Sequence, residues 1–414
     1  MADDGTGMSA AHAGLLSARE PDYAVAPGET LRDRLDELGM RQAELAVRTG
    51  LTTKHINQVL QGVVPLSADV AQRLEYATGV PARLWNRLEA DYRSTLVRLG
   101  QRRDLQDDVG WLAELPVREL VAVGALPPEP SDKVSRVQQL LAFFGVASPE
   151  AWRQLWQRPA AVFRQSQAHP VVPGALAAWL RLGELAARDL DAGDFDAERV
   201  HELLPRLREL TARPLRQAVP VARDSLAATG VVVAFVPEIT GARAYGATRW
   251  LSPQQALIQL SLRGKTDDAL WETLFHELGH VVLHGKREMF VELGEPSDRD
   301  SGRPAHDVAS GERGTQERDA WRFATRVLFG ETGLARLDEV QTVDDAVDLA
   351  DELGIAPSIV VARLQASGRW SYRQGARLKR PVPPLEELTG DGPSRVQPRP
   401  RRQDRRRKGE DDAD

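Results

Sequence analysis

The 414-residue chain contains no cysteine. Disulfides, thiolate metal sites and cysteine nucleophiles are therefore excluded, and any metal must be held by nitrogen and oxygen ligands. Histidine is also scarce, yet three of its eight copies, His276, His280 and His284, fall within WETLFHELGHVVLHGK at residues 271–286. The absence of cysteine suits a reducing compartment, and a cytoplasmic protein is predicted.

Long apolar runs are absent as well. The longest candidate, VVVAFV from Val231, is the size of a β-strand, whereas a membrane span needs about 18 apolar residues. The N-terminus MADDGTGMSA lacks the basic start and apolar stretch of a secretory signal. With 42% hydrophobic and 28% charged residues, the composition is that of a globular protein, and no membrane partner is expected.

The net charge of −6 is unevenly spread along the chain. The last stretch, PSRVQPRPRRQDRRRKGEDDAD, carries eight basic residues between Arg395 and Lys408 and then turns acidic, so it cannot build a core. It is predicted to be a disordered tail. Electrostatic contact with nucleic acid and a solvated solubility tail remain alternative interpretations of it.

A helix-turn-helix is predicted within residues 27–96. Apolar residues have helical spacing up to Gly39, a short helix follows in RQAELAVRT, and Gly50 separates it from LTTKHINQVLQG, which Thr52 or Thr53 caps. Donor and acceptor groups on the outer face of the helix in LTTKHINQVLQG can read base edges. Gln42, at the start of the preceding helix, is placed to contact a phosphate. The candidate DNA-binding residues are Gln42, Thr52, Thr53, Lys54, His55, Asn57 and Gln58.

The pattern of apolar and polar residues in 27–96 also fits a small helical bundle with a polar surface that binds no DNA. However, the segment from APGETLRDRLDELGM onward resembles the HigA-type antitoxin branch of the phage-repressor-like (XRE) helix-turn-helix family, with its proline-glycine-glutamate start and the glutamine that opens its second helix. The segment closes with the matching residues Leu84, Trp85, Leu88 and Tyr92. The resemblance implies sequence-specific binding of a double-stranded DNA operator, as a homodimer.

Residues 97–215 are predicted to form a helical connector, because apolar residues recur at three- and four-residue intervals between proline- or glycine-containing breaks. The isolated His169 and His201 are expected to be structural. The aromatic residues expected in its core are Trp152, Trp156 and Trp179. The pattern then changes to β-type alternation in GVVVAFVPEI, YGATRWLS and ALIQLSLR, so a small sheet is predicted just before the histidine cluster.

The stretch TDDALWETLFHELGHVVLHG is predicted to be one helix. His276 and His280 lie four residues apart, so both side chains leave the same face and can converge on one ion. Glu277 is rotated by about 100° and lies beside that ion. In such an HExxH arrangement the imidazoles hold zinc and the glutamate takes a proton from water. His284, roughly 12 Å along the axis from His276, is assigned a packing or supporting role.

A catalytic zinc site also needs a third protein ligand and an open position for water. Lys286 stands where a further histidine, six residues after His280, would be required. The later stretch TQERDAWRFATRVL has helical spacing, with Glu317 on its apolar stripe and Asp319 rotated away from it. Geometry alone leaves Glu312, just before this helix, as another candidate.

HELGHVVLH followed by ERDAWRFA resembles the ImmA/IrrE family of zinc metallopeptidases, and GATRWLS, IQLSLR and GIAPSIVVARLQ resemble it too, over residues 215–375. The resemblance implies that His276, His280 and Glu317 bind the metal and that Glu277 is the general base. Trp321 departs from the family pattern, in which Asn or Asp is usual, and leaves the shape of the cleft open. VLFG lacks the proline that commonly follows in the family.

The expected cofactor is Zn²⁺, and Mn²⁺ could replace it because nitrogen and oxygen ligands discriminate poorly between the two. The resemblance implies an endopeptidase that cleaves a regulatory protein, typically a repressor. The substrate is expected to extend along a free strand edge within residues 244–262. Tyr245 and Arg263 are candidates for stabilising the oxyanion.

Two functions of different classes remain. One is a DNA-binding transcriptional regulator with a zinc metalloendopeptidase domain, and the other is a non-proteolytic, antitoxin-like repressor whose metal site is structural or sensory. Glu277 favours the first, because a structural site does not use a base.

The predicted fold is α+β and mostly α-helical, with these segments: a disordered leader at 1–26, the helix-turn-helix domain at 27–96, the helical connector at 97–215, a zincin-like metallopeptidase domain with a small β-sheet at 216–380, and the disordered tail at 381–414.

Overall fold

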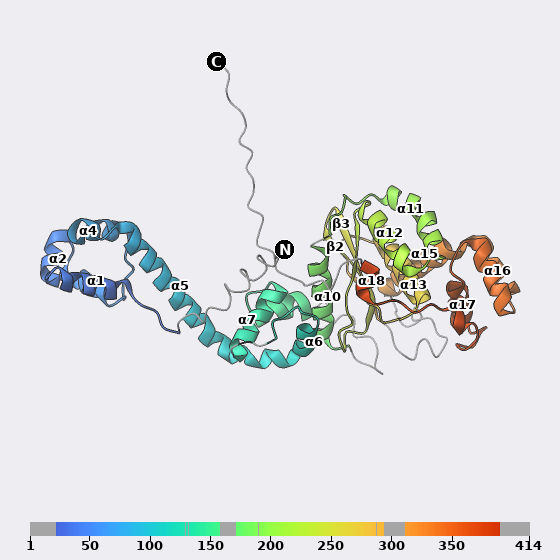
Figure 1. Cartoon of the computed structure of the whole chain (residues 1–414), viewed down its shortest axis with the longest axis horizontal. Helices are drawn as coiled ribbons and strands as arrows, with labels where there is room; N and C mark the ends of the chain where they lie inside the picture. Colours follow the sequence, from blue (N-terminus) through green and yellow to red (C-terminus); the bar gives the residue numbers. More distant parts are fainter. Residues whose placement is uncertain are drawn as a thin grey trace, which may run out of the picture. The chain divides into compact units, whose positions relative to one another are not determined.

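Two compact units make up the chain, Met1–Val109 and Gly110–Asp414. The computed structural model describes residues 22–128, 130, 132–157, 171–188, 190–286, 288–293 and 311–389, with side chains from 314 onward in the last range (Figure 1). These residues form mainly helices and one small sheet, which confirms the predicted α+β, mostly α-helical class. None of the helices in these ranges is long and apolar enough to span a membrane.

The first unit is built from helices that surround one apolar core. They are α1 (Pro27–Glu37), α2 (Gln42–Thr49), α3 (Thr53–Leu60), α4 (Ala68–Thr78) and α5 (Ala82–Asp107). Leu31, Leu45, Ile56 and Trp85 are wholly buried where these helices meet. Gly50, with a φ of 66°, ends α2 in the left-handed conformation that glycine adopts without strain. The predicted pair of short helices separated by this glycine is confirmed as α2 and α3.

Gly28 allows α1 to pack closely on the end of α3. A Cβ on Gly28 would lie 2.2 Å from the backbone oxygen of Leu60, to which Arg32 donates a hydrogen bond of 2.7 Å. We therefore expect Gly28→Ala to lower the free energy of unfolding of the first unit by about 1–3 kcal/mol, because the two helices must move apart. Urea unfolding of the full chain, followed by circular dichroism, measures this loss.

Gly100 provides the control for this substitution. It lies inside α5, and no atom outside its own helix is within 4 Å of an added Cβ. Alanine has the higher helix propensity, so Gly100→Ala should raise the same free energy by up to about 1 kcal/mol. If both variants shifted stability in the same direction, the close approach at Gly28 would not be the cause.

The described part of the second unit contains one four-stranded sheet. Its strands are β1 (Val231–Phe235), β2 (Ala244–Ser252), β3 (Gln255–Leu260) and β4 (Phe290–Leu293), in the order β1-β3-β2-β4. β1 runs parallel to β3, and β2 is antiparallel to both β3 and β4. The first three strands confirm the sheet predicted before the histidine cluster. β4 escaped prediction because four residues are too few for a recognisable alternation.

Helices cover both faces of this sheet (Figure 1). α10 (Pro173–Ala187) packs on one face, against Val232, Ala234 and Leu257. α12 (Leu215–Ala227) and α13 (Asp267–Leu283) pack on the other face, and α11 (Ala197–Leu210) lies against α12. Successive strand residues point to opposite faces, so the uninterrupted apolar run of β1 supplies side chains to both layers.

The predicted connector at 97–215 is divided between the two units. Its first residues continue α5 to Asp107, and the remainder joins the sheet unit because α10 buries its apolar face on the strands. The elements before α10 are η2 (Asp108–Glu114), α6 (Val117–Ala122), α7 (Lys133–Phe144), α8 (Pro149–Trp152) and η3 (Arg153–Gln157). The predicted core residues Trp152, Trp156 and Trp179 are buried. His201 is exposed and contacts the Ala197 carbonyl, whereas His169 lies outside the described residues.

A buried ion group fastens α10 to the sheet. Glu184 of α10 pairs with Arg181 of the same helix and, at 2.9 Å, with Arg249 of β2. Arg181 also donates a hydrogen bond of 2.6 Å to the carbonyl of Phe143 at the end of α7. Both guanidinium groups lie 5.9 Å from the ring centroid of Trp156. The Glu184 carboxylate therefore neutralises two arginines, and their contacts connect α10, β2 and α7.

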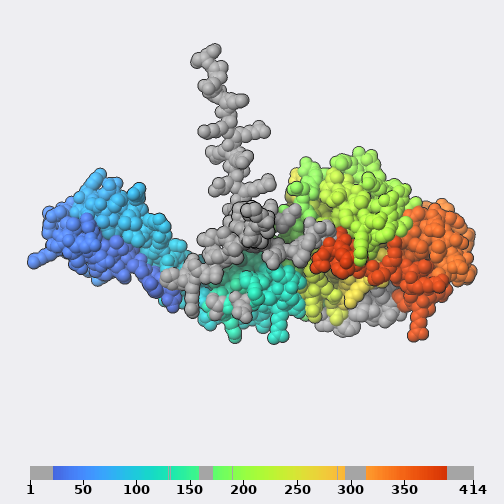
Figure 2. Space-filling model, in the orientation of Figure 1, coloured from blue at the N-terminus to red at the C-terminus, as the bar shows by residue number. Residues whose placement is uncertain are grey.

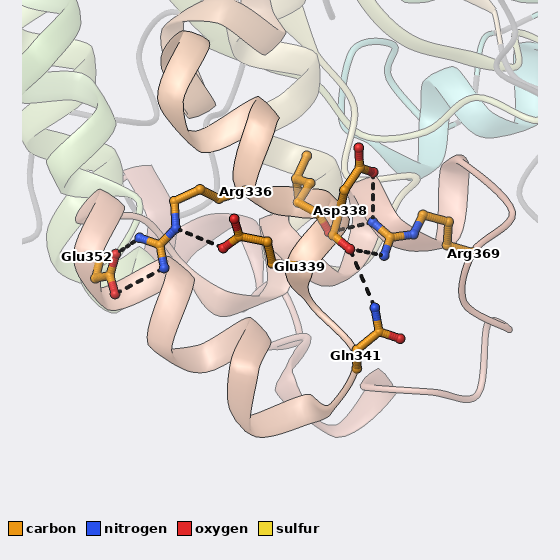
Figure 3. Close-up of polar contacts among 7 residues, drawn as sticks. Arg336, Asp338, Glu339, Gln341, Glu352 and Arg369 are labelled. Carbon is orange, nitrogen blue, oxygen red and sulfur yellow. Dashed lines mark hydrogen bonds and ion pairs between the residues drawn. The ribbon is translucent and has the colours of Figure 1, made fainter.

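The helix α15 (Gly311–Arg336) is kinked at Gly330, and its end is fixed by arginine contacts. Figure 3 shows Arg336 paired with Glu352 of α16 (Val343–Leu353) and with Glu339 of η5 (Leu337–Glu339). Arg369, which follows α17 (Pro357–Ala366), donates to the backbone oxygens of Leu337, Asp338 and Val340. These contacts hold together the helices that follow α15.

Residues 381–389 are ordered, which corrects the prediction of a disordered tail from 381. The segment follows η6 (Ala376–Leu378) and contains α18 (Leu385–Thr389), in which Leu388 is wholly buried. Arg380 donates two hydrogen bonds to Asp267 at the start of α13, and α18 packs on α12, as the red segment beside the yellow-green surface in Figure 2 shows. The predictions for 1–21 of the leader and 390–414 of the tail lie outside the described residues.

Candidate metal centre and DNA-binding face

The helices α13 and α15 approach each other closely at Gly279. A Cβ on Gly279 would lie 3.0 Å from the Cα of Ala320, so a larger residue at either position would separate the helices. Glu317 precedes Ala320 by three residues and therefore lies on the same face of α15. The small residue inside HELGH thus brings Glu317 to the histidines, although the two helices are far apart in sequence.

The side chains of His276, His280 and Glu317 converge on one point. The Nε2 atoms of the two histidines are 3.1 Å apart, and Glu317 Oε2 lies 3.2 Å from the first and 3.5 Å from the second. One ligand atom of each residue falls within a group spanning no more than 4.8 Å. Two imidazoles and one carboxylate fit the ligand set of a zinc site with an open fourth position.

Electrostatics at this group favour a positive charge beside Glu317. Burial acts to lower the pKa of His276, but the hydrogen bond to Glu317 and the nearby carboxylates outweigh it and raise that pKa to about 9. For His280, burial dominates and lowers the pKa to about 4. Burial acts to raise the pKa of Glu317, but its contacts with both imidazoles hold it well below its usual range. The nearby carboxylates thus favour a positive charge at this group, and a bound cation would supply one.

Glu277 is wholly buried beside β2. Its Oε2 accepts a hydrogen bond of 2.6 Å from the Thr248 hydroxyl, while its Oε1 has no hydrogen-bond partner in the described part of the chain. Burial raises the pKa of Glu277 to about 8, against the opposing effect of His276. A Cβ on Gly246 would lie 2.5 Å from Oε1, so only glycine leaves room for this carboxylate.

Thr248 and Gly246 were missed in the sequence analysis. They occur two residues apart in β2, and strand alternation therefore directs both toward α13. The available signal was the string GATRWLS, which contains both residues and resembles the ImmA/IrrE family. Glu292 of β4 was also missed, although its charge acts on both His276 and Glu277.

Aromatic rings flank both candidate histidine ligands. The ring centroid of Trp321 lies 4.5 Å from that of His276, and Phe290 of β4 stacks on His280 at 4.0 Å. Trp321, the departure from the family pattern, therefore lies directly beside the candidate site. His284 Nδ1 is 3.0 Å from His280 Nδ1, a position that suits the supporting role predicted for it.

Tyr245 and Arg263, the residues suggested for oxyanion stabilisation, lie beside each other. Arg263 pairs with Glu238, and its guanidinium lies 5.7 Å from the Tyr245 ring centroid. Strand alternation directs Tyr245 to the face opposite Gly246, and the register of β2 against β4 is irregular at this point. The suggested role of either residue in oxyanion stabilisation stays a prediction.

Asp319, another carboxylate considered near the start of α15, is not brought to the group. Asp319 pairs with Arg322 at 3.4 Å on the exposed side of the helix, as its rotation away from the apolar stripe predicts. The side chain of Glu312 lies outside the described residues. Glu317 is thus the carboxylate of this helix that the structure places with the histidines.

The prediction of a free strand edge within residues 244–262 is wrong. β2 lies between β3 and β4, and β3 lies between β1 and β2, so both predicted strands are interior. Sheet order depends on pairing between distant segments, which local alternation cannot reveal. In the described residues the edge strands are β1 and β4. Phe290 places β4 next to the His276–His280–Glu317 group.

The predicted DNA-binding residues lie along α2, α3 and the turn between them. Thr52 is the N-cap of α3, where its hydroxyl accepts a hydrogen bond of 3.1 Å from the His55 backbone nitrogen. His55 and Gln58 are half-buried. The exposed members of the set are Gln42, Thr52, Thr53, Lys54 and Asn57. Ile56 on the opposite side of α3 is wholly buried, so the polar face of this helix is presented outward.

Comparison with known proteins bears on this first unit. Residues 31–85 match the helix-turn-helix family model. The match runs from α1 to the start of α5, so the first unit carries a helix-turn-helix of a DNA-binding regulator. A solved structure from Nostoc punctiforme, assigned as an antidote protein of a plasmid maintenance system, is 27% identical, with 20% of this chain and 92% of that chain covered and a TM-score of 0.20. No curated protein matches the chain.

Proposed function

We propose that the protein is a DNA-binding transcriptional regulator whose second unit is a zinc-dependent endopeptidase. The observation that carries the proposal is the convergence of His276 Nε2, His280 Nε2 and Glu317 Oε2, with the buried Glu277 next to them in sequence. The resemblance to the ImmA/IrrE family supports the same conclusion, and a repressor is the substrate class that it implies. A metal site used only for structure or sensing would not need a buried carboxylate beside its ligands.

In the proposed peptide hydrolysis, Glu277, Thr248 and β4 each have a separate role. Bound zinc would supply Lewis-acid activation of water and of the scissile carbonyl. Glu277 takes the proton from water and returns it to the leaving amine, because its Oε1 is not engaged by other described groups. Thr248 holds the other carboxylate oxygen. The peptide substrate pairs along β4, the edge strand whose Phe290 lies on His280.

Cleavage of unstructured peptides by the full-length protein tests this proposal. Zinc-loaded wild type is incubated with a fluorogenic peptide library, and products are identified by mass spectrometry. We expect cleavage that a chelator stops, that added zinc restores, and that Glu277→Gln abolishes while retaining its zinc. A wild type that holds one zinc per chain and cleaves no peptide would instead favour the non-proteolytic, antitoxin-like repressor with a structural or sensory metal.

The DNA-binding face gives a separate prediction. Asn57→Ala should weaken binding to a site selected from random DNA by about 1–3 kcal/mol and leave binding to unselected DNA unchanged, because an exposed amide on α3 reads base edges. Lys54→Ala should weaken both and reduce the slope of log K against log salt by about one, because its ammonium group neutralises a phosphate.

Fluorescence anisotropy at several salt concentrations measures both effects. Gln101→Ala is the control, because Gln101 is exposed on α5 and outside the two helices of the motif. If Asn57→Ala weakened selected and unselected DNA equally, Asn57 would be a backbone contact and not a base-reading residue.

A further inference from the structure

We propose that His284 is a positioning residue that fixes the ring tautomer and orientation of His280 for metal binding. The inference rests on the metal site of the proposed function and goes beyond it, because it assigns a task to a residue outside the three candidate ligands. The contact that carries it is the 3.0 Å distance between His280 Nδ1 and His284 Nδ1.

The two ring nitrogens of His280 face different partners. Its Nε2 lies 3.1 Å from His276 Nε2 and 3.5 Å from Glu317 Oε2, so Nε2 is the nitrogen that would bind the cation. A neutral imidazole carries one N–H, and a metal-binding nitrogen must be the one without it. The proton of His280 must therefore be on Nδ1, from which it donates to the lone pair of His284 Nδ1.

The end of α13 places His284 for this contact. The helix ends at Leu283, and His284 adopts an extended conformation, with φ −116° and ψ 168°, while its backbone N–H still donates to the His280 carbonyl at 3.2 Å. Phe290 stacks on His280 and lies 5.1 Å from the His284 ring. The two imidazoles are thus held together by the backbone on one side and by an aromatic ring of β4 on another.

Among the described residues His276 has no such support, so His284 supports one of the two histidine ligands. The Nδ1 of His276 is buried without a hydrogen-bond partner in the described part of the chain, and its ring is instead flanked by Trp321. His280 is the ligand for which the chain supplies an acceptor. Loss of that acceptor would leave a buried N–H unpaired and favour the other tautomer, whose proton blocks Nε2.

Zinc affinity of the full-length chain tests this inference, measured by competition with a chromophoric chelator. His284→Leu removes the acceptor at similar side-chain size and should weaken zinc binding by about 10–100-fold. His284→Asn places Oδ1 near the position of Nδ1 and should restore most of the affinity, because it accepts the same hydrogen bond. His201→Leu is the control, because His201 is exposed on α11 and contacts only a carbonyl of its own helix among the described residues.

The outcomes separate this inference from the proposed function. Equal zinc affinity in wild type and His284→Leu, or an Asn variant as weak as the Leu variant, would overturn the role of His284 and leave the metal site standing. A wild type that binds no zinc would overturn both. Nitrogen-15 NMR of the zinc-loaded protein gives an independent readout: we expect a proton on His280 Nδ1, and a proton on Nε2 would contradict the assignment. Circular dichroism of the metal-free variants checks that each is folded.

Discussion

Glu317→Ala is expected to abolish zinc binding by the full-length protein. Among the described residues the Glu317 carboxylate is the oxygen ligand placed with the two imidazoles, at 3.2 Å and 3.5 Å from their Nε2 atoms. Two nitrogens alone cannot complete a zinc site, which needs at least three protein ligands. We expect about one zinc per chain in the wild type and almost none in Glu317→Ala or His280→Ala after dialysis, measured by atomic emission.

Asp319→Ala is the matched control for this loss. It removes a carboxylate from the same helix two residues further on, where the side chain pairs with Arg322 on the exposed side. This variant should keep its zinc. If Glu317→Ala kept its zinc as well, the third ligand would lie elsewhere, and Glu312, the alternative left open by sequence geometry, would be the next residue to replace.

Glu184→Ala is expected to lower the free energy of unfolding of the second unit by about 3–5 kcal/mol. Its carboxylate is paired with Arg181 and Arg249, whose side chains are 8% and 13% exposed. Burial, followed by repulsion from another arginine, lowers the pKa of each guanidinium to about 10, which shows how poorly these charges are solvated. Without Glu184 both charges would be buried with no carboxylate partner that the structure shows.

Glu114→Ala is the control, because Glu114 pairs with Arg153 at the same distance of 2.9 Å but with side chains that are 34% and 38% exposed. Solvent screens this pair, so its loss should cost at most about 1 kcal/mol. Guanidinium unfolding of the full chain followed by tryptophan fluorescence compares the two, since Trp156 lies beside both buried arginines. If Glu184→Ala and Glu114→Ala lowered the free energy of unfolding equally, burial of the Glu184 ion pairs would not increase their contribution to stability.

Helical periodicity predicted most of the architecture correctly. α13 begins at Asp267, as the acidic start of TDDALWETLFHELGHVVLHG indicates, and it ends at Leu283, just before Gly285. In α3 the hydroxyl of Thr52 caps the helix, and Ile56 points into the core, as the spacing required. These features depend on residues three or four positions apart, whose relation is set by the geometry of a single helix.

The C-terminal boundary shows the limit of such local patterns. Residues 381–389 have too short an apolar pattern to predict a helix, yet Leu388 is wholly buried and Arg380 binds Asp267 across more than a hundred residues of sequence. The connector boundary at 215 failed for a similar reason, because α10 joins the sheet through contacts such as that of Glu184 with Arg249. Local composition predicts which segments fold, but the boundaries of a folded unit depend on contacts with residues distant in the sequence.

The sequence by itself determined the helix-turn-helix, the mostly helical class and the placing of His276 and His280 on one helical face, because each is a property of neighbouring residues on one element. Only the tertiary structure decided that Glu317 meets them, that Thr248 and Gly246 enclose Glu277, and that β4 is the strand edge beside them. Those relations depend on how close two helices approach and on the order of strands in a sheet, and such long-range contacts leave no periodic trace along the chain.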